Sequence, residues 1–195
     1  MAVSPSRSRS ALLIVDLQLG MFNGKRLAPI HAGETLLLNT RMVIERANHV
    51  RVPVIFVRHA GPVGHLLEEG TPDWRIHPAI APRSGERVID KRTPDSFHET
   101  SLSSDLAVDG IDRLIVMGAQ TEVCVDTTCR RAFSLGFEVT LVSDGHSTWE
   151  NATLTADQII RHTNDTLAGW FVRLARVDEP GKWVDSFAAN AAPSV

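Results

Sequence analysis

The stretch RLIVMGAQTEVCV, residues 113–125, contains the pattern that decides the fold. Its first half is a continuous apolar run, which is typical of a strand buried on both faces of a parallel sheet. Gly118 ends this run, and a helix is expected to follow over residues 122–135, closed by Gly136. A buried strand, a turn and a helix form one unit of an α/β protein. Cys124 falls in the expected first turn of that helix.

The same alternation continues along the chain. Short apolar runs are separated by segments of helical period, the pattern of a mainly parallel sheet covered by helices. The expected strands are residues 11–17, 52–58, 87–91, 113–118, 138–144 and 171–177. The expected helices are residues 34–50, 103–108, 122–135 and 154–170, the last with Thr153 as its N-cap. The sequence therefore predicts an α/β fold with a mainly parallel six-stranded sheet.

Length and charge limit the possible functions. The 195 residues suffice for one compact domain, expected over residues 10–195 after a disordered, solvated tail at residues 1–9. A net charge of −3 gives no electrostatic reason to expect nucleic acid or a membrane as partner, and the apolar runs are too short to span a bilayer. The two cysteines lie too close in sequence to join distant elements, so we expect reduced thiols and a cytoplasmic location.

Three polar residues coincide with the ends of expected strands. Asp16 lies near the end of the first strand, Lys91 closes the third, and Cys124 comes just after the fourth. Each alone has an ordinary structural explanation, as a turn residue, a surface lysine and a small core side chain. In open parallel sheets, however, ligands bind beyond the carboxyl ends of the strands. We therefore expect these three side chains to meet at one candidate site.

Cys124 is the stronger nucleophile candidate of the two cysteines. At the N-terminus of a helix, free backbone N–H groups and the helix dipole are expected to depress the pKa of its thiol. The same N–H groups can receive an oxyanion. Beside this thiol, Lys91 would stabilise the thiolate and Asp16 would act as a general base. Cys129, further along the same helix, is expected to be a core residue.

Three motifs resemble those of the isochorismatase-like cysteine hydrolases, in the order and spacing of that family. They are VDLQLGMF (15–22), VIDKRTPDSF (88–97) and GAQTEVCV (118–125), the last continued by DTTCRRAFSLGFEVTLVSDG. The resemblance extends over residues 11–174 and implies a Rossmann-like three-layer α/β/α fold. It also implies a hydrolase without a cofactor that cleaves a C–N bond of a small amide, ureido, carbamoyl or lactam substrate.

The resemblance assigns roles to the residues that match the motifs. Cys124 attacks the carbonyl carbon to form an acyl-enzyme, Asp16 carries the thiol proton to the leaving amine, and Lys91 orients and charge-stabilises the pair. A non-proline cis peptide bond is implied between Ala119 and Gln120. It would direct a backbone N–H near Gln120 to join that of Cys124 in an oxyanion hole.

Single residues argue against other functions of the same scaffold. Isochorismatases that cleave a vinyl ether need no thiol, and Cys124 argues against them. Nicotinamidases bind a metal through an Asp-x-His motif after the second strand, whereas the segment at residues 58–70 offers only His59 and His65, so no metal is predicted. A binding protein without catalysis would have no need to retain all three polar residue types.

Residues close to Cys124 in this arrangement are candidates for substrate binding. They are Phe22, Trp74, Phe97, Gln120 and Glu122. Core packing is an equal alternative for Phe22 and Phe97, and Glu122 would either complement the helix dipole or pair with a substrate ammonium. The Pro- and Gly-rich segment at residues 61–85 is expected to be a functional loop, and His146 and Trp149 are expected on the same face. Within the family, the residues look closest to the amidohydrolases, which include carbamoyl and ureido hydrolases and streptothricin hydrolase. The resemblance implies a homo-oligomer, a dimer or tetramer.

Overall fold

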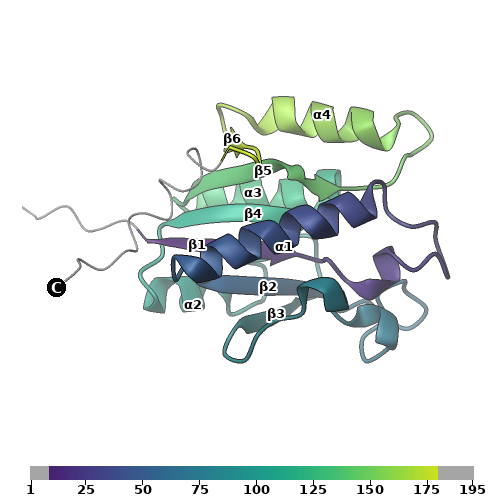
Figure 1. Ribbon diagram of the computed structural model, residues 1–195, viewed down its shortest axis with the longest axis horizontal. Helices are drawn as coiled ribbons and strands as arrows, with labels where there is room; N and C mark the ends of the chain where they lie inside the picture. Colours follow the sequence, from purple (N-terminus) through teal and green to yellow (C-terminus); the bar gives the residue numbers. More distant parts are fainter. Residues whose placement is uncertain (1–8, 180–195) are drawn as a thin grey trace, which may run out of the picture.

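The computed structural model describes residues 9–179. The predicted tail, apart from Arg9, and the predicted end of the domain at residues 180–195 lie outside this range. Six strands form one sheet, all of them parallel, in the order β3-β2-β1-β4-β5-β6 (Figure 1). The strands are β1 (Ser10–Val15), β2 (Val54–His59), β3 (Arg87–Lys91), β4 (Arg113–Ala119), β5 (Glu138–Ser147) and β6 (Arg173–Ala175). The predicted six-stranded α/β fold is confirmed.

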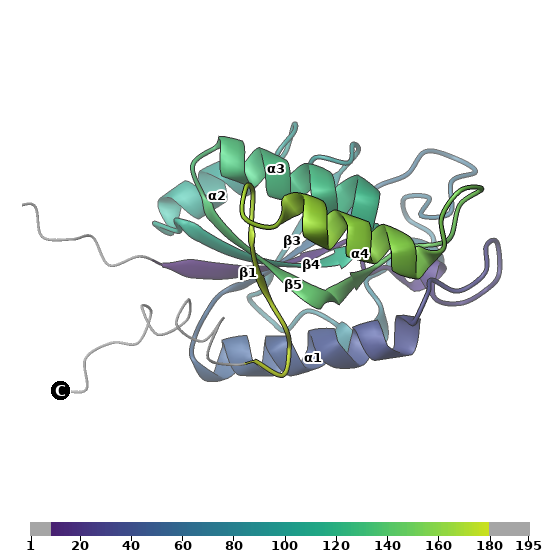
Figure 2. The same cartoon turned by 90° about the horizontal axis from the view of Figure 1, so that it is seen from above.

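Four helices cover the two faces of the sheet. They are α1 (Gly33–His49), α2 (Leu102–Val108), α3 (Asp126–Ser134) and α4 (Ala156–Leu167). Figure 2 shows α1 on one face and the other three helices on the opposite face, which makes the three layers. None of the helices within residues 9–179 combines the length and the apolar character that crossing a bilayer requires.

The core explains why the strand sequences are continuous apolar runs. Every residue of β1 is buried, because successive side chains point to opposite faces and both faces are covered. Leu12 and Ile14 pack in the cluster that α1 closes, and Leu13 and Val15 pack in the cluster on the other face. From β1, the strands β2 and β3 are added on one side of the sheet, and β4, β5 and β6 are added on the other side. The order therefore reverses between β1 and β4, and ligands of doubly wound sheets bind at such a position.

Several boundaries differ from those expected, and the start of α4 and the end of β5 have clear physical reasons. Helix α4 is capped by Thr155 rather than Thr153, because the Thr155 hydroxyl accepts from the backbone N–H of Gln158 and the Gln158 side chain reciprocates in a capping box. Strand β5 extends to Ser147, beyond the predicted end at residue 144, after a break in its pairing with β4. Gly136 follows α3 with φ +91°, as the sequence predicts.

Candidate active site

The carboxyl ends of β1, β3 and β4 bring together the three polar residues expected at a site. Lys91 Nζ lies 2.7 Å from Asp16 Oδ2 and 3.2 Å from Cys124 Sγ. Its third contact is the backbone carbonyl oxygen of Thr93 at 3.0 Å. The lysine thus connects the carboxylate to the thiol, and one ammonium contacts both groups.

Burial separates these residues from ordinary surface charges. Asp16 is 0% exposed and Lys91 is 1% exposed, while Cys124 retains partial exposure. Burial alone lowers the pKa of Lys91, but Asp16 and Cys124 raise it by more, so its pKa lies above the ordinary value. Lys91 therefore stays charged at neutral pH, and its charge is compensated by the carboxylate.

The pKa of the Cys124 thiol is shifted in the direction opposite to the one predicted. Burial, followed by the negative charge of Asp16, raises the pKa of Cys124 to about 12, although Lys91 acts to lower it. The expectation of a depressed pKa was wrong, because it considered the local helix terminus and not the desolvation of the thiol. The resting thiol is neutral at pH 7, so a nucleophilic thiolate requires transfer of its proton to a base. Asp16 is the carboxylate available for this.

A sharp turn carries Cys124 to this position. Gly118 has φ +143°, and a Cβ there would lie 2.1 Å from the carbonyl oxygen of Val15 on the neighbouring strand. Only glycine allows β4 to approach β1 this closely at the turn. The following peptide bond, between Ala119 and Gln120, is cis, as expected from the motif.

Cys124 does not lie in an α-helical first turn. Residues Thr121–Val125 form a π-helical turn that continues directly into α3. The backbone N–H of Val125 donates to the carbonyl oxygen of Gln120 at 3.0 Å. Turns of this kind are rare and occur frequently at functional sites.

The proposed substrate-binding residues divide into two groups. Trp74 is half-buried beneath the guanidinium of Arg58, and Phe22 is half-buried with its ring edge against His77. Gln120 is half-buried, and Glu122 is exposed and accepts a hydrogen bond from Thr148. Phe97, in contrast, is 7% exposed and packs against Phe137 in the core, so the structure supports its core alternative.

Gln18 is a site residue that the sequence did not reveal. Its buried amide donates to the carbonyl oxygens of His59 and Trp74 and accepts from the backbone N–H of His59. It therefore fastens the loop at residues 61–85 to the end of β2, beside Asp16. A glutamine two positions after the candidate base, in an otherwise apolar segment, is the signal that could have pointed to it.

Burial lowers the pKa of His59. The described residues contain no cluster of three or more His, Cys, Asp or Glu side chains that could hold a metal ion.

Comparison with known proteins identifies the family. The isochorismatase domain matches residues 10–166, and the chain therefore belongs to the isochorismatase family of hydrolases. It is 34% identical to a streptothricin hydrolase of Streptomyces noursei over 140 residues, which cover 72% of this chain and 50% of that protein. It is 30% identical to a ureidoacrylate amidohydrolase of Stutzerimonas stutzeri over 132 residues, covering 68% of this chain and 49% of that protein.

The chain spans about half the length of these two curated relatives. Among solved structures, an isochorismatase from Pseudomonas putida KT2440 superposes with a TM-score of 0.83 at 30% identity, covering 91% of this chain and 93% of that one. The resemblance seen in the three motifs is thereby confirmed at the level of family and fold.

Proposed function

We propose that this protein is a cysteine-dependent hydrolase that cleaves the C–N bond of a small amide, ureido, carbamoyl or lactam substrate. The observation that carries the proposal is the contact of the Lys91 ammonium with both Asp16, at 2.7 Å, and Cys124, at 3.2 Å. A carboxylate, an ammonium and a thiol are here held together at the strand ends where such folds bind ligands.

In the first half of the reaction, Asp16 accepts the proton of the Cys124 thiol as the sulfur attacks the substrate carbonyl carbon. The transfer is needed because the pKa of the thiol is raised, so that a free thiolate is scarce at neutral pH. Lys91 keeps its positive charge throughout and compensates the negative charge that moves between the carboxylate and the sulfur.

The tetrahedral intermediate carries its negative charge on the former carbonyl oxygen. The backbone N–H groups of Gln120 and Cys124, at the turn after β4, are the donors proposed for this oxyanion. When the C–N bond breaks, the proton on Asp16 passes to the leaving nitrogen, which departs as ammonia or an amine. Water then attacks the acyl group on sulfur, and Asp16 takes a proton from this water. When the C–S bond breaks, the proton passes from Asp16 to the Cys124 sulfur, and the acid product leaves the restored thiol.

The names of the relatives support this class of bond. One of them is an amidohydrolase acting on ureidoacrylate, and another acts on streptothricin. The presence of Cys124 supports thiol chemistry over cleavage of a vinyl ether, which needs no thiol. Trp74, Phe22, Gln120 and Glu122 remain the proposed substrate contacts.

A substrate screen tests the proposal. Purified protein is incubated with panels of primary amides, ureido and carbamoyl compounds, and released ammonia is measured; lactams are followed by the mass gain of one water. Nicotinamide is included among the primary amides, and isochorismate represents the competing class of vinyl ethers. We expect turnover in the C–N panels that disappears in Cys124→Ala. Turnover confined to isochorismate, or turnover that survives in Cys124→Ala, would overturn the proposal.

A further inference from the structure

His146 occupies a place that depends on a break in the sheet. Along β4 and β5, Val116 pairs with Leu141, but Gly118 pairs with His146 because the register shifts between Val116 and Gly118. Without this shift, Ser143 would face Gly118. Bulges of this kind reorient side chains and are frequent beside active sites. Here the shift sets His146 directly opposite Gly118. Gly118 begins the turn at residues 118–125, which contains Cys124 and is called the nucleophile turn.

The imidazole is buried and held at both nitrogens. His146 is 4% exposed; its Nδ1 lies 2.9 Å from Thr121 Oγ1 and its Nε2 lies 3.0 Å from Asn164 Oδ1. The Asn164 amide nitrogen donates to the carbonyl oxygen of Ser143, which leaves its oxygen to accept from His146. His146 therefore carries its proton on Nε2, and Nδ1 accepts the hydroxyl proton of Thr121. Burial keeps the pKa of His146 below its ordinary value, so the ring is neutral.

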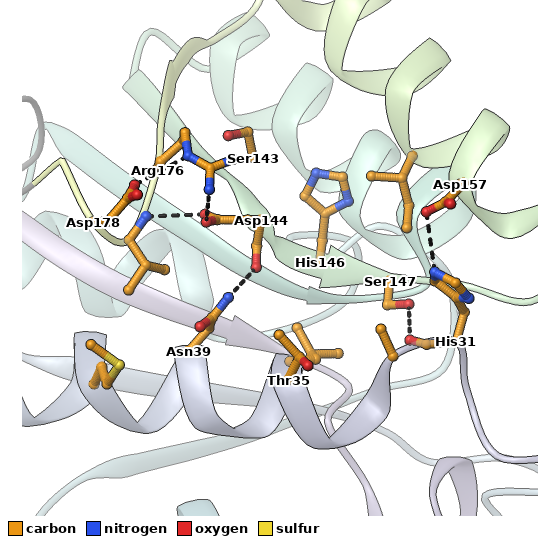
Figure 3. A pocket seen from close by; sticks show the side chains of 15 residues that line it. His31, Thr35, Asn39, Ser143, Asp144, His146, Ser147, Asp157, Arg176 and Asp178 are labelled. Carbon is orange, nitrogen blue, oxygen red and sulfur yellow. Dashed lines mark hydrogen bonds and ion pairs between the residues drawn. The ribbon is translucent and has the colours of Figure 1, made fainter.

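The side chain also borders a cavity of about 500 Å³ between α1, β5 and the start of α4. Figure 3 shows His146 projecting from β5 between the cavity residues of α1 and α4. The polar groups around it pair with one another, as His31 does with Asp157 and Asn39 with the backbone of Asp144. The partners of His146, Thr121 and Asn164, are not among the cavity residues. Both ring nitrogens are thus hydrogen-bonded to the nucleophile turn and to α4, and neither is paired with a cavity residue.

We infer that His146 is a positioning residue that holds the nucleophile turn through Thr121. Thr121 is fully buried, directly follows the Ala119–Gln120 cis peptide bond and begins the π-helical turn that contains Cys124. Its hydroxyl ties this turn to β5 and, through the imidazole, to α4. This inference rests on the proposed function, since it assigns His146 a role in orienting Cys124 towards Asp16 and Lys91.

Matched variants separate the two hydrogen bonds. His146→Asn places an amide oxygen near the position of Nδ1, which preserves an acceptor for Thr121 but loses the contact with Asn164. His146→Gln places an amide near the position of Nε2, which preserves a donor for Asn164 but loses the acceptor for Thr121. Thr121→Val removes the hydroxyl with little change of shape. His49→Gln, at the exposed end of α1, is the control for a histidine substitution.

The readout is the rate at which iodoacetamide alkylates Cys124, followed by peptide mass spectrometry, together with kcat and KM for a substrate from the screen. We expect His146→Gln and Thr121→Val to slow alkylation and lower kcat by about tenfold, with KM changed less than about twofold, because a small displacement of a reacting atom has effects of at least this size. His146→Asn should stay within about twofold of wild type, and the double variant with Thr121→Val and His146→Gln should resemble Thr121→Val alone.

Cys129 serves as an internal measure of unfolding, because it is 0% exposed and should remain unlabelled in a folded variant. If His146→Gln and Thr121→Val label Cys124 at the wild-type rate, or if Cys129 becomes labelled together with Cys124 in both, the inference is overturned. Asp16→Asn distinguishes this failure from that of the proposed function. Loss of turnover in Asp16→Asn beside wild-type labelling rates in the His146 and Thr121 variants would reject only the positioning role. Wild-type turnover in Asp16→Asn would reject the triad itself.

Discussion

The ammonium of Lys91 and the carboxylate of Asp16 form an ion pair with a separation of 2.7 Å, and both side chains are almost completely buried. Two opposite charges in such a place stabilise each other only as long as both are present. Removing one leaves the other charged and desolvated. The pair proposed for catalysis is therefore also a point at which the fold can be weakened.

Lys91→Met is expected to lower the free energy of unfolding by about 3–5 kcal/mol, because it leaves the Asp16 carboxylate buried without a compensating charge. Urea denaturation measures this loss. The double variant with Asp16→Asn should recover a large part of it. Arg92→Met is the control, since Arg92 pairs with Glu69 on the surface and should cost less than about 1 kcal/mol. Equal costs for the two single variants would contradict the account of the buried pair.

The two cysteines should separate function from stability. Cys124→Ala is expected to abolish turnover, while Cys129→Ala should retain it and lose about 1 kcal/mol of stability, because Cys129 is fully buried in the core. Steady-state rates and thermal denaturation of the two variants provide the comparison. Similar activity in both would remove the assignment of Cys124 as nucleophile.

The stability of the protein should depend on the Cys124 thiol at alkaline pH. Its pKa is raised in the folded state from 9.0 to about 12. Between these values the folded state binds the proton that the unfolded state has released, so stability is fully present below pH 9 and falls as pH rises towards 12.

Comparing wild type with Cys124→Ala isolates this contribution, because Cys129 is common to both. Denaturation curves at pH 8, 9 and 10 are expected to show a steeper loss of stability for wild type than for the variant above pH 9. Parallel curves across this range would mean that the thiol is not perturbed in the direction described.

Gly118→Ala should disrupt the turn after β4. The added Cβ would lie 2.1 Å from the carbonyl oxygen of Val15, in a backbone conformation with φ +143°. We expect a loss of at least about 3 kcal/mol in the free energy of unfolding. Gly136→Ala is the matched control, because Gly136 also has a positive φ, +91°, but no atom within 4 Å of an added Cβ. Its cost should be about 1 kcal/mol, and thermal denaturation compares the two.

The sequence was sufficient to predict what depends on local pattern. Continuous apolar runs located the strands, and the polar residues at their ends led to Asp16, Lys91 and Cys124, because parallel strands end at one edge of the sheet. The bulge in β5 was beyond such reasoning, since a shift in register is a relation between two strands and not a property of either. For the same reason the sequence pattern predicts a strand that ends at residue 144, before His146, whereas His146 lies within β5.

Burial accounts for the other differences. The thiol of Cys124 was judged from its position at a helix terminus, but its pKa is governed by desolvation and by the charge of Asp16, both of which depend on distant segments. Phe97 follows the motif that contains Lys91, yet it contacts Phe137 in the core. Proximity to Lys91 in the sequence did not show which way this ring points.

The most direct test of the central claim is to locate the acyl group during turnover. The protein is mixed with a slowly hydrolysed substrate from the screen, quenched in acid and digested, and its peptides are analysed by mass spectrometry. The account predicts an acyl adduct on the peptide that contains Cys124, absent from Cys124→Ala. An acyl group on any other residue, or continued turnover in Cys124→Ala, would contradict it.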